Sequence, residues 1–115
     1  DHGVEVVTTG QFGTISADQA QALATVLNEL VANSVEHGLA DRDGRIEVSA
    51  RREGLSMTVT VADDGLGFAP GTPMTGLGTQ IVQQMVRGEL RGSIEWTPRE
   101  GGGTLVTLMI NLDPA

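Results

Sequence analysis

Apolar and polar residues alternate in several short stretches of the chain, which is the pattern of strands with one buried face. The clearest case is 45–52, where Ile46, Val48 and Ala50 alternate with polar residues. Glu53-Gly54 then favours a tight turn into a strand that ends at Asp63, so an antiparallel hairpin is predicted. Further strands are predicted over 4–9, 93–97 and 104–112. The last of these has apolar residues on both faces, which predicts a central strand covered on both sides.

Two longer segments carry their apolar residues at helical spacing instead. The first helix is predicted over 17–37, with Ser16 as its N-cap, Gln19 completing a capping box and Gly38 ending it. The second helix is predicted over 79–87. The buried stripes are expected to consist of Leu23, Val26, Leu27, Leu30, Val31 and Val35 in the first helix and Ile81, Val82, Met85 and Val86 in the second.

The 115 residues suffice for one domain with one hydrophobic core. A hydrophobic content of 39% and a mean hydropathy of −0.02 are typical of a soluble globular protein. No apolar run approaches the roughly 20 residues of a membrane helix, so no direct membrane contact is expected. Cysteine is absent, which excludes disulfides and thiolate metal sites and fits a cytoplasmic location. Asp1 is not a natural start, so residues 1–115 are expected to be a single domain of a longer protein.

The formal net charge of −8 disfavours binding to the phosphate backbone of a nucleic acid. All 7 basic residues are arginine, so the chain lacks the lysine that a Walker-type phosphate loop requires. A bound phosphate group would therefore depend on backbone amides, a helix N-terminus and a metal ion.

The stretch 59–68 begins as a β-branched strand and stops at Asp63, followed by Gly65 and Gly67. A carboxylate at a strand end can accept a hydrogen bond from an exocyclic amine such as that of adenine, while the glycines let the backbone approach a ligand. The alternative is a tight turn, because Asp-Gly is a common turn dipeptide.

Glu29, Asn33 and His37 are spaced four residues apart, so they share one face of the first predicted helix. Asparagine is unfavourable inside a helix, and its amide oxygen is a suitable ligand for Mg²⁺. The neighbouring carboxylate could orient or deprotonate a nucleophile. The alternative is a solvated helix face, and His37 by itself is more typical of a capping or core residue.

Gly76-Leu77-Gly78 precedes the second predicted helix, whose exposed N-terminal amides could bind phosphate oxygens. The alternative is a simple loop. The stretch 69–75 contains two prolines, one glycine and no charge, which predicts a short mobile flap.

Four of these segments, taken together and in this order, resemble the histidine-kinase ATPase superfamily, which includes DNA gyrase B, MutL and heat-shock chaperone ATPases. Residues 28–37 resemble its N box, 63–67 its G1 box, 76–79 its G2 box and 101–104 its closing Gly-x-Gly-Thr. The resemblance covers nearly the whole chain. It is closest to the catalytic ATP-binding domain of bacterial sensor histidine kinases, in the subgroup with a short ATP lid (HisKA_2-like).

This resemblance implies the Bergerat fold, an α+β fold in which a two-layer α/β sandwich has a mixed, mostly antiparallel sheet covered on one face by helices. It implies ATP and Mg²⁺ as cofactors, Asn33 as the metal ligand and Glu29 as the catalytic acidic residue near the γ-phosphate. Asp63 would accept from the adenine amine, with Thr104 nearby. The other nucleotide-binding residues that it implies are His37, Gly65, Gly67, Gly76, Leu77, Gly78 and Thr79.

The implied reaction is transfer of the γ-phosphoryl group to a histidine on a separate dimerisation domain of the same protein, and indirectly to a response regulator. His2 lacks the helical context of that acceptor, which is therefore expected outside this chain. The family often has a basic residue three positions after the metal-binding asparagine, where this chain has Glu36. The candidate substitutes are an arginine of the partner domain and, in this chain, Arg42 or Arg87.

Two other functions remain open at this point. The same fold could belong to an anti-sigma-factor-type serine kinase, which differs in its acceptor. It could also be a degenerate domain that binds a partner and no nucleotide, for which Glu36 is the supporting residue.

Overall fold

The structure, a computed structural model, describes residues 4–10, 13, 15–33, 44–64, 77–99 and 102–113. Along the chain these residues form β1 (Val4–Gly10), α1 (Ala17–Asn33), β2 (Gly44–Glu53), β3 (Ser56–Asp63), α2 (Leu77–Arg87), β4 (Ser93–Pro98) and β5 (Thr104–Asn111). The predicted end of the first helix at 37–38 and the predicted flap at 69–75 lie outside the described residues.

The strands form one sheet in the order β1-β2-β3-β5-β4. β1 runs parallel to β2, and the other neighbouring pairs are antiparallel. The predicted hairpin is confirmed: β2 and β3 are joined at Gly54, which has a φ of +60°. The sheet is therefore mixed and mostly antiparallel, as the family resemblance implied.

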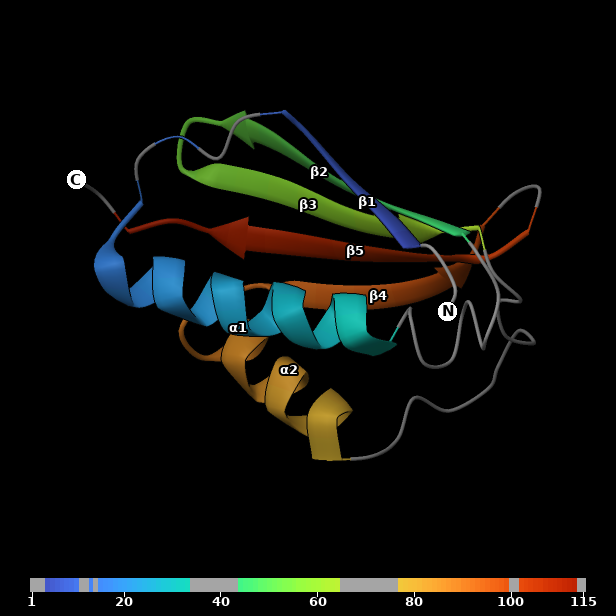
Figure 1. The fold of residues 1–115 in the computed structure, drawn as a ribbon. Helices are drawn as coiled ribbons and strands as arrows, with labels where there is room; N and C mark the ends of the chain where they lie inside the picture. The colour runs from blue at the N-terminus through green and yellow to red at the C-terminus, as the bar shows by residue number, and fades with distance from the viewer. Residues whose placement is uncertain are drawn as a thin grey trace.

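Both helices lie on the same face of the sheet (Figure 1), which gives the two layers of the predicted sandwich. The alternation in β2 and β3 directs their apolar residues toward the helices, because side chains on alternate positions share a face. The core formed between the layers includes Leu23, Val26, Leu30, Ile46, Val48, Met57, Val59, Val61, Val82, Val86, Leu90, Val106, Leu108 and Ile110.

In the described part of the chain, the far face of β5 is open at Met109, which corrects the prediction that this strand is covered on both sides. β5 is central, between β3 and β4, and its Leu108 is fully buried. Met109 on the opposite face is 52% exposed and accepts a hydrogen bond from Thr58 at 3.6 Å. The apolar residue Met109 therefore does not indicate a second layer over this part of β5.

The start of α1 confirms Ser16 as the N-cap, since the backbone N–H of Gln19 donates to Ser16 Oγ at 3.2 Å. The predicted capping box is only half right. The Gln19 side chain is fully buried and bonds instead to the carbonyls of Glu89 and Asn111 and to the N–H of Asp113. It joins α1 to the α2–β4 connection and to the residues after β5.

α2 begins at Leu77, two residues earlier than predicted, so Gly78 belongs to the helix. Val82 and Val86 are buried as expected, but Ile81 is 40% exposed and does not belong to the core. No described helix has both the length and the apolar character needed to cross a membrane.

Candidate functional site

Asp63 is the last residue of β3 and is 2% exposed, so the carboxylate expected at this strand end is buried. It lies opposite Thr104, the first residue of β5, in the antiparallel register. The backbone N–H of Thr104 donates to Asp63 Oδ1 at 3.3 Å. The structure therefore brings together two predicted site residues from the two strands, and the hydrogen bond orients the carboxylate.

Gly103 explains why the chain needs glycine just before Thr104. Its φ is +96°, and a Cβ atom there would overlap the carbonyl oxygen of Asp63. Neither the backbone conformation nor the close approach accommodates a side chain. The short Gly-Thr motif thus has a mechanical role, because it allows the start of β5 to reach the end of β3.

Asp64 is a residue of this region that the sequence reading did not single out. It is exposed, and its Oδ1 accepts a hydrogen bond from the backbone N–H of Arg45 at 2.9 Å. This bond ties the chain leaving β3 to the start of β2. The sequence shows Asp64 as a second carboxylate directly after a predicted strand. Its hydrogen-bond partner could not be predicted, because that partner depends on the register between β2 and β3.

On α1, Glu29 is partly buried and Leu30 beside it is 1% exposed. Leu30 packs into the core, which holds this part of the helix against the sheet. The described part of α1 ends at Asn33, one helical turn after Glu29. A spacing of four residues places both positions on one face of the helix.

Figure 1 shows these elements converging toward one end of the molecule. The C-terminal end of α1, the end of β3, the start of β5 and the N-terminal end of α2 all lie toward that end. α1 also contacts both α2 and β3. In α2, Thr79 is 9% exposed, whereas the predictions at His37, Gly65, Gly67 and Gly76 lie outside the described residues.

The described residues contain no metal site built from protein side chains alone. Within the described ranges, no group of three His, Cys, Asp or Glu side chains is placed to hold a metal. Mg²⁺ is commonly held by one or two protein oxygens together with substrate phosphates and water. The expected metal ligand, Asn33, is the last described residue of α1, and its role stays a prediction.

Residues 18–114 match the protein family described as "Histidine kinase-, DNA gyrase B-, and HSP90-like ATPase". The chain belongs to this ATPase family. The match runs from the first turn of α1 to the residues after β5, so it includes the described site residues discussed above. ATP binding is a property of the family, and the predicted resemblance to it is confirmed.

Curated relatives are named as sensor histidine kinases. The chain is 35% identical over 115 residues to sensor histidine kinase PdtaS of Mycobacterium tuberculosis, covering 96% of this chain and 23% of the relative. It is 35% identical over 82 residues to a blue-light-activated histidine kinase of Rhizobium johnstonii, covering 69% of this chain and 24% of that protein. The chain therefore spans about a quarter of the length of these relatives.

Solved structures give the same result for the fold. The histidine kinase domain of Erythrobacter litoralis EL346 superposes with a TM-score of 0.82 at 27% identity, over 96% of this chain and 52% of that one. A nucleotide-free catalytic domain of the histidine kinase ThkA superposes with a TM-score of 0.77 at 22% identity, over 98% of this chain and 81% of that chain. The chain is an ATPase domain of the histidine kinase type, and the predicted fold class is confirmed.

Proposed function

We propose that this chain is the Mg-ATP-binding catalytic domain of a cytoplasmic, short-lid sensor histidine kinase. It transfers the γ-phosphoryl group of ATP to a histidine on a dimerisation domain outside this chain. The observation that carries the proposal is the buried Asp63 carboxylate, held by the Thr104 N–H at the end of the molecule where α1 and α2 also converge. The names of the relatives support histidine as the acceptor in preference to serine.

In this proposal Asp63 selects the base. A carboxylate is an acceptor only, so it suits the exocyclic amine of adenine and rejects a base that has a carbonyl there. The Thr104 N–H fixes the carboxylate orientation before the nucleotide arrives. Burial strengthens the discrimination, because a buried acceptor facing another acceptor is costly.

The phosphates are bound from α1 and from the start of α2. Asn33 would hold Mg²⁺, which would supply positive charge to the phosphates, and the amides at Leu77 and Gly78 would donate to phosphate oxygens at the positive end of α2. The Thr79 hydroxyl adds a donor. Gly65, Gly67, Gly76 and His37 are the further nucleotide-binding residues that the family resemblance implies, and we include them in the proposal on that ground.

Glu29 is the catalytic group. In the transfer, the acceptor imidazole nitrogen forms a bond to the γ-phosphorus while the bond to the β–γ bridging oxygen breaks, and ADP leaves with that electron pair. The Glu29 carboxylate accepts a hydrogen bond from the other imidazole N–H, which orients the ring and raises the nucleophilicity of the attacking nitrogen.

The proposal is tested by incubating the chain with γ-labelled ATP, Mg²⁺ and the dimerisation domain of the same protein. A phosphorylated product that is labile to acid and stable to base identifies phosphohistidine, and Glu29→Gln is expected to lower its rate with little effect on ATP affinity. Asn28→Asp, a change at the preceding exposed position, serves as the matched control. ATP binding without any transfer, or an acid-stable product, would contradict the histidine kinase assignment.

A further inference from the structure

A groove of about 660 Å³ runs along the seam between α1 and α2. Its residues come from the N-terminal half of α1, from the part of α2 after its first turn, and from Glu89 in the turn that follows α2, whereas Glu29 and Asn33 belong to the C-terminal half of α1. The lining consists of Asp18, Gln21, Ala22 and Thr25 on one side and Ile81, Gln84, Met85 and Glu89 on the other.

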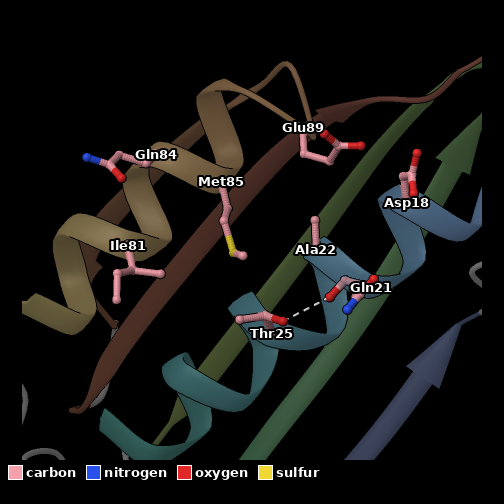
Figure 2. A pocket seen from close by; sticks show the side chains of 8 residues that line it. All are labelled: Asp18, Gln21, Ala22, Thr25, Ile81, Gln84, Met85 and Glu89. Atoms are coloured by element: carbon pink, nitrogen blue, oxygen red, sulfur yellow. Dashed lines mark hydrogen bonds between the residues drawn. The ribbon is translucent and has the colours of Figure 1, made fainter.

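The apolar part of this groove is formed by Ala22, Ile81 and Met85, and the other five lining residues are polar or charged. Ala22 is buried, and Met85 reaches from α2 across the seam toward α1 (Figure 2). Ile81 is one of the large apolar side chains exposed in the described part of the chain, at 40%. The Thr25 hydroxyl donates to the Gln21 carbonyl within α1, at 3.0 Å, so its hydrogen is not offered to a ligand.

The spacing of the lining residues matches the footprint of another helix. On α1 they recur at i, i+3, i+4 and i+7, and on α2 at i, i+3 and i+4, so each helix presents one ridge to the seam. A third helix lying on a seam between two ridges can pack against both at once. The α1 positions span about two turns, roughly 10 Å, which suits an apolar stripe of three or four residues.

The charged residues of the groove are all acidic and lie at one of its ends. Asp18 and Glu89 lie at the same end of it (Figure 2), both are exposed, and none of the eight lining residues is basic. Among the described residues neither carboxylate has an ion-pair partner. The excess negative charge of the whole chain, −8, acts in the same direction and disfavours an acidic partner, a nucleic acid or an anionic membrane.

We propose that this groove docks a basic amphipathic helix of a partner protein. Its apolar residues would cover Ile81, Met85 and Ala22, and lysine or arginine at one end would pair with Asp18 and Glu89. The pairing sets the direction of the bound helix, because both carboxylates lie at one end. Docking here leaves the nucleotide end of α1 uncovered, so the chain can hold the partner and ATP together.

The test uses the chain itself and a synthetic probe. The probe is a capped Leu/Lys peptide of about 18 residues, long enough to form a helix, with leucines at i, i+3, i+4 and i+7 and lysines concentrated at one end. Binding is followed by two-dimensional NMR of the labelled chain, which reports shifts residue by residue. Shifts confined to the eight groove residues and their neighbours are expected.

Two variants, changed only at exposed positions, probe the apolar and the charged parts of the groove without disturbing the core. Ile81→Ser is expected to weaken binding about tenfold, and Asp18→Asn with Glu89→Gln about fivefold. The matched controls are Met109→Ser on the open sheet face, which is 52% exposed, and Glu53→Gln with Glu95→Gln on exposed strand positions. Both control proteins are expected to bind like the unchanged chain.

Several results would overturn the proposal. Equal losses in the groove variants and their controls would mean nonspecific attraction to an acidic protein. Equal binding of a peptide with glutamate in place of lysine would show that charge does not select the partner. Equal binding of a peptide with its leucines permuted would show that the groove does not recognise an amphipathic helix. Concentration-dependent dimerisation that Ile81→Ser abolishes, without peptide binding, would assign the groove to a second copy of the chain.

Discussion

Gly103 lies against the carbonyl group of Asp63 so closely that a Cβ atom would overlap the oxygen, and its φ is +96°. This relationship decides how the start of β5 reaches the end of β3. Because the approach is possible, the next residue, Thr104, can place its N–H on the buried Asp63 carboxylate. A glycine without chemistry of its own thereby orients the group that we propose selects the base.

Gly103→Ala is therefore expected to destabilise the chain by about 3 kcal/mol, from backbone strain together with the overlap. Gly102→Ala is the matched control. Its φ is +115° but a Cβ atom there meets nothing within 4 Å, so only strain of about 1–2 kcal/mol is expected. Urea denaturation measures both, and equal losses would mean that the contact with Asp63 has no effect.

Gln19→Leu tests the buried glutamine. Its amide bonds to the carbonyls of Glu89 and Asn111 and to the N–H of Asp113, all of which lose their side-chain partner in the variant. We expect a loss of about 3–5 kcal/mol in unfolding free energy, since unsatisfied buried groups cost about 1–3 kcal/mol each. Gln21→Leu, an exposed position on the same helix, should lie within about 0.5 kcal/mol of the unchanged chain.

Ser16→Ala removes the N-cap of α1. The expected loss of unfolding free energy is about 1 kcal/mol, because the N–H of Gln19 loses its acceptor. Thr25→Ala is the control: the Thr25 hydroxyl only donates back to a helical carbonyl, so a change near zero is expected by thermal denaturation. A larger effect at Thr25 than at Ser16 would contradict the capping assignment.

Asn33→Ala tests the proposed metal ligand. In the unchanged chain, Mg²⁺ is expected to tighten ATP binding measured by calorimetry; in the variant that gain should fall by roughly tenfold or more, while metal-free ATP binding changes little. Asn28→Ala, at an exposed position on the same helix, should keep the gain. An unchanged Mg²⁺ effect in Asn33→Ala would remove Asn33 from the metal site.

Local pattern predicted most of the elements. The alternation in β2 and the turn at Gly54 are each determined by residues a few positions apart, so both can be predicted from the local sequence. The same holds for Ser16, whose capping bond spans three residues. Such features need no knowledge of the rest of the fold.

Long-range contacts explain the errors. Gln19 fits a capping box locally, but its side chain forms hydrogen bonds with residues 70 to 94 positions away along the chain. Only folding brings these partners close to Gln19. Ile81 fits the helical stripe, yet periodicity does not state how far the neighbouring layer extends, and the residue lies at the edge of the α1–α2 seam. The contact between Asp63 and Thr104 likewise depends on the pairing of β3 with β5, and the resemblance to the family supplied it, not the local pattern.

The most direct measurement of the central claim compares ATP with ITP, which carries a carbonyl in place of the adenine amine, by calorimetric titration of the chain, of Asp63→Asn and of Asp64→Asn. The account predicts that the unchanged chain and Asp64→Asn bind ATP about 10- to 100-fold more tightly than ITP, which is the value of one hydrogen bond to a charged group. It predicts that Asp63→Asn weakens ATP binding and loses this preference. Equal binding of ATP and ITP by the unchanged chain, or a preference that survives in Asp63→Asn, would contradict the role assigned to Asp63.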